Sequence, residues 1–65
     1  MDKFVSMTVR DDSGNECSFG YNGSDDKIAA KVTALLSVPG NVSVTVLEYQ
    51  NNTPAWPSKT YTSQP

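Results

Sequence analysis

Two pairs of neighbouring carboxylates and one thiol are the side chains of this 65-residue chain whose types could support catalysis. The carboxylate pairs are Asp11-Asp12 and Asp25-Asp26, and the thiol belongs to Cys17. Histidine, the residue that most often transfers protons near neutral pH, is absent. The two pairs fall in a turn and at a helix start, and both places expose a carboxylate to solvent. The sequence therefore predicts no catalytic residue and no enzyme activity.

The same region does not form a recognisable site for a metal or a cofactor. Oxygen ligands are offered by Asp11, Asp12, Asn15 and Glu16, but their spacing is not that of a calcium-binding EF-hand loop. Cys17 shares one face of a predicted strand with Phe19, so we expect an unreactive thiol in the core. As the single cysteine it cannot form an internal disulfide, which favours a reducing compartment and a cytoplasmic location. No cofactor and no metal are expected.

The charge balance limits the classes of partner. The chain carries 5 Lys and Arg residues against 7 Asp and Glu residues, a net charge of −2, and the cations are scattered singly. Nucleic acids and anionic membranes both require a surplus of cations on the protein, and no apolar run approaches the roughly 20 residues that span a bilayer. Direct binding to nucleic acid or membrane is therefore not expected. The partner we expect is a protein with a basic surface.

Alternation of apolar and polar residues predicts three strands. The first two cover residues 4–10 and 16–21, and the turn-forming residues 11–15 between them indicate a hairpin. The third strand covers residues 41–50, the most β-prone segment of the chain.

One helix is predicted over residues 25–37. Ile28 and Val32 begin an apolar stripe at helical spacing. Ser24 is a suitable N-cap, because its hydroxyl can accept a hydrogen bond from a backbone N–H of the first turn. The helix should end before Pro39, since proline removes a donor and disfavours helix in the preceding residue.

These elements predict an α+β fold, a small β-β-α-β domain. A helix between two strands of one sheet makes a right-handed crossover between parallel strands, so the first strand should lie between the other two. The sheet would be three-stranded and mainly antiparallel, in order 2-1-3, with the helix on one face. Residues 1–50 would form this compact domain. Residues 51–65 would be a Pro- and Asn-rich C-terminal extension, either partly packed through Trp56 or mobile, in which residues 59–62 could add a short fourth strand.

The predicted core lies between the helix and one face of the sheet. The strands contribute Val5, Met7, Val9, Cys17, Phe19, Tyr21, Val42, Val44 and Val46, and the helix contributes Ile28, Ala29, Val32, Leu35 and Leu36.

The predicted topology gathers the acidic residues at the two ends of the domain. Asp2, Asp25, Asp26 and Glu48 would lie at one end, and Asp11, Asp12 and Glu16 at the other. One interpretation is that these carboxylates only solvate the surface and cap the helix. The other is that they dock on a basic partner, where complementary charge speeds association and selects the partner. One form of such docking is imitation of nucleic-acid phosphates.

An aromatic cluster is predicted on the opposite sheet face. Phe4, Leu47 and Tyr49 should form a local apolar patch there, and Trp56 follows closely enough to reach it. Either Trp56 covers this patch as a small satellite core, or part of the patch stays exposed and binds a partner, since aromatic side chains dominate interface energetics.

These observations predict a non-enzymatic, protein-binding module. The form we expect is a small inhibitor of the kind that phages or mobile elements encode, which blocks a host defence complex or nucleic-acid-handling complex through acidic and aromatic contacts. The alternative is a structural or assembly subunit that associates with further copies through a sheet edge, strand two or strand three. The sequence is compatible with a monomer or a homodimer.

Overall fold

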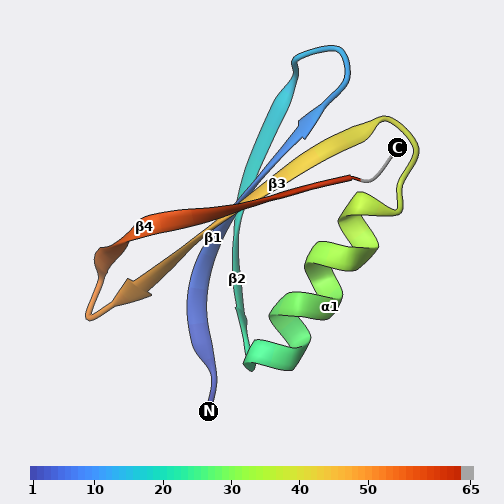
Figure 1. Ribbon diagram of the computed structural model, residues 1–65. Coiled ribbons are helices and arrows are strands. Elements are labelled where there is room, and N and C mark those ends of the chain that lie inside the picture. The colour runs from blue at the N-terminus through green and yellow to red at the C-terminus, as the bar shows by residue number, and fades with distance from the viewer. Residues whose placement is uncertain (64–65) are drawn as a thin grey trace.

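The computed structural model describes residues 1–63 and contains one sheet and one helix (Figure 1). In chain order the elements are β1 (Lys3–Asp11), β2 (Glu16–Gly23), α1 (Asp25–Leu36), β3 (Asn41–Gln50) and β4 (Thr53–Thr62). The strand order is β2-β1-β3-β4, and every neighbouring pair is antiparallel. The predicted small α+β fold is confirmed, including the order 2-1-3 for the first three strands.

The hairpin between β1 and β2 closes through a three-residue loop. The carbonyl of Asp11 accepts a hydrogen bond from the backbone N–H of Gly14 at 3.2 Å, and the Asp11 N–H donates to the carbonyl of Asn15 at 3.0 Å. Gly14 has a φ of +85°, a conformation that glycine adopts without steric cost. This geometry is a turn followed by a left-handed residue, a common solution for three-residue hairpin loops.

Helix α1 begins and ends at side chains that satisfy its free backbone groups. The Ser24 hydroxyl accepts a hydrogen bond from the backbone N–H of Lys27 at 3.4 Å, as predicted for an N-cap. At the other end the side-chain amide of Asn41 donates to the carbonyl of Leu35 at 2.8 Å. The helix ends at Leu36, one residue earlier than predicted.

The core is small and lies where α1 covers the sheet. Its buried members come from the two central strands and the helix, and its half-buried members surround them. The buried residues are Val5, Met7, Val44, Val46 and Val32, and those packed against them are Val9, Phe19, Tyr21, Ile28, Leu35 and Leu36.

Two residues predicted in the core are exposed instead, namely Cys17 and Ala29. α1 starts directly after β2 ends and reaches the start of β3, so it crosses the sheet obliquely (Figure 1). The far end of β2, where Cys17 lies opposite Val9, is therefore left uncovered. The prediction that the Cys17 thiol lies in the core was therefore wrong.

β4 extends the sheet beyond the predicted three strands. The turn before it consists of Asn51 and Asn52, with φ values of 51° and 64°, the left-handed pair that two-residue hairpin turns require. β4 then pairs with β3 over residues 53–62, well beyond the short strand predicted at residues 59–62. These residues were expected in an extension outside the compact domain. Gln64 and Pro65, the last two residues of that extension, lie outside the described residues.

β4 contains an irregularity halfway along its length. Val46 lies opposite Lys59 and Glu48 lies opposite Ala55, so β4 carries extra residues between these positions. The excess includes Trp56 and Pro57, which are joined by a cis peptide bond. Because β4 covers its outer side, β3 is an interior strand, and the expectation that strand three could offer a free edge was wrong.

The loop conformation at Gly14 can be tested by substitution. A side chain there would meet no atom within 4 Å, so Gly14→Ala should destabilise the protein only through its positive φ, by about 1 kcal/mol. Chemical denaturation monitored by circular dichroism measures this difference. Ser13→Ala in the same loop is the matched control and should change the free energy of unfolding by less than about 0.5 kcal/mol. Equal stabilities for Gly14→Ala and the parent would contradict the loop geometry.

Candidate functional site

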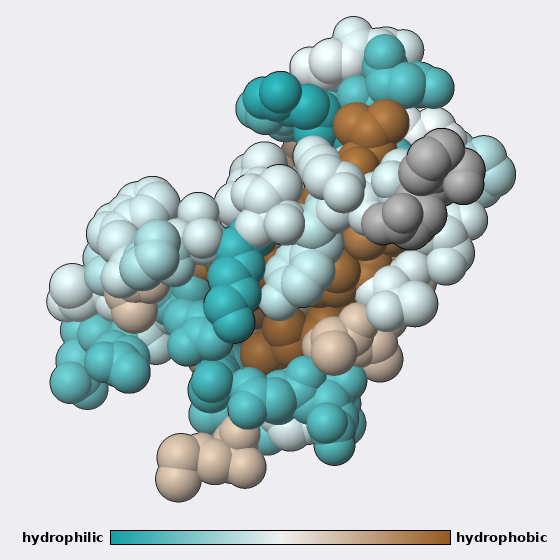
Figure 2. Space-filling model, in the orientation of Figure 1, coloured by the Kyte–Doolittle hydropathy of each residue, from teal (hydrophilic) through white to brown (hydrophobic). Residues whose placement is uncertain are grey.

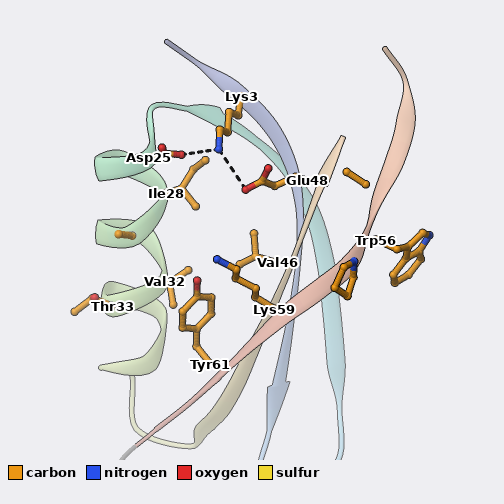
Figure 3. A pocket seen from close by; sticks show the side chains of 13 residues that line it. Lys3, Asp25, Ile28, Val32, Thr33, Val46, Glu48, Trp56, Lys59 and Tyr61 are labelled. Atoms are coloured by element: carbon orange, nitrogen blue, oxygen red, sulfur yellow. Dashed lines mark hydrogen bonds and ion pairs between the residues drawn. The ribbon is translucent and has the colours of Figure 1, made fainter. Parts of the chain in front are cut away.

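A groove of about 650 Å³ lies between α1 and β4 on the side of the sheet that faces the helix (Figure 3). Val46 of β3 lies between its two walls. Ile28 and Val32 of α1 line one wall, and Lys59 and Tyr61 of β4 line the other. In the space-filling view, apolar surface is visible between the more polar residues of this face (Figure 2). The groove exists because the helix contacts β2 and β3 and leaves the helix-facing side of β4 open.

Lys3 closes one end of the groove with two carboxylates. Its ammonium nitrogen lies 3.0 Å from Asp25 Oδ1 and 3.4 Å from Glu48 Oε2 (Figure 3). The hydrogen bond to Asp25 is the main cause that raises the pKa of Lys3, and the bond to Glu48 adds to it. All three side chains are exposed to solvent, which screens both ion pairs. The effect of these ion pairs on stability is therefore small. Two carboxylates thus share one cation.

The opposite wall of the groove carries a cation that points inward. Lys59 and Tyr61 extend from β4 toward α1 (Figure 3), and both line the groove together with Val32. Lys59 takes part in none of the ion pairs found among residues 1–63. The groove is therefore charged unevenly, with an acidic end at Asp25 and a positive group further along.

The first predicted acidic cluster is partly assembled. The structure brings Asp25 and Glu48 to the same ammonium group, as the predicted topology required. The sequence prediction missed Lys3, which sits between them. Its position could have been found, because the alternation of β1 places Lys3 on the same sheet face as Val5.

Two of the three carboxylates in the second predicted acidic cluster, Asp11 and Glu16, make local contacts. Arg10 forms an ion pair with Glu16 across the hairpin. Asp11 Oδ1 accepts hydrogen bonds from the backbone N–H groups of Asn15 at 2.9 Å and Ser13 at 3.0 Å, and the bond from Asn15 is the largest cause that lowers the pKa of Asp11. These carboxylates stabilise the turn. Within residues 1–63, no group of three or more His, Cys, Asp or Glu side chains is placed to hold a metal ion.

The predicted aromatic patch contains one edge-to-face pair and stays open to solvent, since Phe4 is 49% exposed. Phe4 contacts Tyr49 edge to face, with ring centroids 5.6 Å apart, and its ring lies so close to Gly20 that a Cβ there would approach Phe4 Cζ to 2.8 Å. Trp56 is 70% exposed. It lies at the rim of the groove with its indole turned away from α1 (Figure 3). The interpretation in which Trp56 covers the Phe4 patch as a satellite core was wrong.

Comparison with known proteins does not assign the chain to a group: no protein-family model matches it, and no curated protein or solved structure is significantly similar. In residues 1–63 no helix has both the length and the apolar character needed to cross a bilayer.

The contacts of Asp11 predict a specific pH dependence. A carboxylate with a lowered folded-state pKa contributes stability above its unfolded pKa, and this contribution is lost as the pH falls through the folded value. Asp11→Asn retains an acceptor oxygen but not the charge. The variant should be less stable than the parent at pH 7, and the difference should shrink steadily below about pH 4.

Thermal unfolding at a series of pH values between 7 and 2 measures this difference. Asp12→Asn is the matched control, because the Asp12 side chain accepts none of the hydrogen bonds found in the described part of the chain. A stability difference between Asp11→Asn and the parent that stays constant down to pH 2 would contradict the assignment.

Proposed function

We propose that this chain is a non-enzymatic protein-binding module that holds an arginine- or lysine-bearing segment of a partner protein in the groove between α1 and β4. The size and position of the groove support this proposal. Its volume of about 650 Å³ lies in the range of ordinary ligand sites, and its walls are the helix and the uncovered side of β4. An open groove between a helix and a strand suits side chains that project from an extended polypeptide.

Apolar contact inside the groove supplies one part of the proposed affinity. Ile28 is half-buried and Val46 is 7% exposed, so an apolar side chain in the groove would complete their burial. Removal of apolar surface from water contributes about 25 cal/mol per Å². Tyr61 is 42% exposed, and an incoming segment would cover its ring.

The acidic end supplies the selectivity for a basic partner. Asp25 and Glu48 share the single ammonium of Lys3, so their remaining oxygen lone pairs are available to an incoming guanidinium, which binds carboxylates through two parallel hydrogen bonds. Asp2 and Asp26 add negative charge nearby in the sequence. Trp56 at the rim offers an exposed aromatic face on which a guanidinium can stack.

The biological role that we propose for this binding is inhibition. A small inhibitor of the phage or mobile-element type would use the groove to occupy a basic segment of a host defence or nucleic-acid-handling complex in the cytoplasm. Imitation of nucleic-acid phosphates receives less support, because Lys3 and Arg10 pair with three of the carboxylates that such a mimic would present.

Titration with short peptides tests the binding site directly. An apolar peptide with two arginines should shift the backbone amide resonances of Ile28, Val32 and Glu48 in nitrogen-15-labelled protein. The same peptide with glutamates in place of the arginines should shift those resonances less, because its side chains gain no partner at Asp25 and Glu48, which repel them. The double variant Asp25→Asn, Glu48→Gln should weaken binding of the arginine peptide by about tenfold, as expected for the loss of roughly 1.4 kcal/mol.

The matched control is the double variant Asp12→Asn, Glu16→Gln, which removes the same charge at the other end of the domain and should bind as the parent does. Trp56→Ala should also weaken binding while leaving the melting temperature unchanged, because the indole is largely exposed. Equal shifts with the arginine and glutamate peptides, or shifts confined to residues outside the groove, would overturn the proposal.

A further inference from the structure

The sheet has two free edges, and they differ in how they are protected against further pairing. β4 carries several features that prevent edge-to-edge association: Pro54 and Pro57, the groove-facing charge of Lys59, and a register shift in its pairing with β3. β2 contains no proline and no lysine. It pairs with β1 without a break from the Lys3–Gly23 position to the Arg10–Glu16 position. β2 is thus a regular, unprotected edge.

The phase of the hydrogen bonds identifies which groups of β2 are free. The bond from Asp11 N–H to the Asn15 carbonyl starts an alternation in which residues 17, 19 and 21 bond to β1. The backbone groups of residues 16, 18, 20 and 22 then point away from the sheet. All four residues are exposed.

A second bond, at the far side of the sheet, gives the same phase. Ser63 N–H donates to the Val42 carbonyl at 3.0 Å, so residues 42, 44 and 46 of β3 bond to β4 and residues 43, 45 and 47 bond to β1. The β1 partners of these last three are residues 10, 8 and 6, which leaves residues 9, 7 and 5 for β2. The two bonds therefore agree on the free groups of β2.

We propose that β2 pairs with β2 of a second copy of this chain, antiparallel and around a two-fold axis, to form one continuous eight-stranded sheet. Antiparallel pairing requires outward-facing residues to lie opposite one another, and every register centred on a residue of β2 meets this condition. With Ser18 opposite Ser18, residue 22 falls opposite Gly14, outside the strand. With Phe19 opposite Phe19, all four outward-facing residues pair, because residue 16 lies opposite 22 and residue 18 opposite 20. With Gly20 opposite Gly20, residue 16 falls opposite Ser24, outside the strand.

The strand is complementary to itself in the register centred on Phe19. Glu16 is the single charged residue of β2, and in this register it lies opposite the neutral Asn22, so that no like charges face each other. The two half-buried Phe19 rings meet at the axis, where non-hydrogen-bonded pairs bring side chains closest. A second copy therefore fits this edge without a change in either strand. The groove beside β4 is at the other edge and stays open in the dimer.

Cross-linking tests the register. In a Cys17→Ser background, the double variant Glu16→Cys, Asn22→Cys should form a disulfide-linked dimer under mild oxidation, because the two positions face each other across the axis. Each single variant is the matched control and should stay monomeric on a non-reducing gel, since its two copies would lie about 20 Å apart. Failure of the double variant to cross-link, or stronger cross-linking of Ser18→Cys, Asn22→Cys, would overturn this register.

Association in solution tests the edge. Sedimentation equilibrium of the native chain from about 10 µM to 1 mM should show a monomer–dimer equilibrium. Ser18→Pro removes an outward-facing donor and should raise the dissociation constant at least tenfold. Thr60→Pro is the matched control: Thr60 faces outward on β4, and each substitution also removes one exposed hydroxyl hydrogen bond, Thr8–Ser18 or Thr45–Thr60. A strict monomer at 1 mM, or a dimer lost with Thr60→Pro and kept with Ser18→Pro, would overturn the proposal.

Discussion

A single helix is too narrow to cover four strands, and this constraint accounts for most of the surface features of the molecule. An α-helix with its side chains is about 10 Å wide, and neighbouring strands are about 4.8 Å apart, so one helix covers about three strands. α1 connects β2 to β3, which flank β1. It must therefore cross these three strands, and β4, which follows β3 through a tight turn, lies beyond its reach. The groove is the direct consequence.

The incomplete cover also explains why the core is small and why β4 matters for it. Only one helix residue, Val32, is buried. Val44 and Val46 of β3 are buried between α1 and the strands on either side, with Tyr61 and Lys59 of β4 as their neighbours in the sheet. β4 thus completes the environment of β3 through backbone pairing and the stems of two amphipathic side chains. The same two side chains remain open to solvent on their other side and form the wall of the groove.

Local patterns in the sequence were sufficient for the elements with regular alternation or clear end signals. The spacing of Val5, Met7 and Val9 predicted β1 and its buried face, and Ser24 predicted the start of α1. β4 was underestimated because Pro54 and Pro57 argue against an interior strand. Those prolines are tolerated at an outer edge, where a missing N–H breaks no ladder bond. That position depends on the whole sheet and cannot be read from the segment itself.

The candidate site was predictable where it depends on topology and not where it depends on the path of the helix. The convergence of Asp25 and Glu48 followed from the strand order. The exposure of Cys17 did not, because the alternation of β2 identifies the face of the sheet but not how far along the strand the helix covers it. The outward position of Trp56 depends on the irregular pairing of β4, for which no local signal was recognised.

Solvent paramagnetic relaxation of side-chain protons, measured at low protein concentration with a soluble gadolinium complex, tests most directly whether α1 leaves β4 uncovered. If α1 leaves β4 uncovered, the ring protons of Tyr61 and the side-chain methylenes of Lys59 relax strongly. The methyl groups of Val5 and Val44 then relax weakly. If the Tyr61 and Lys59 protons were as protected as those of Val44, the groove would not exist in solution and the account would be wrong.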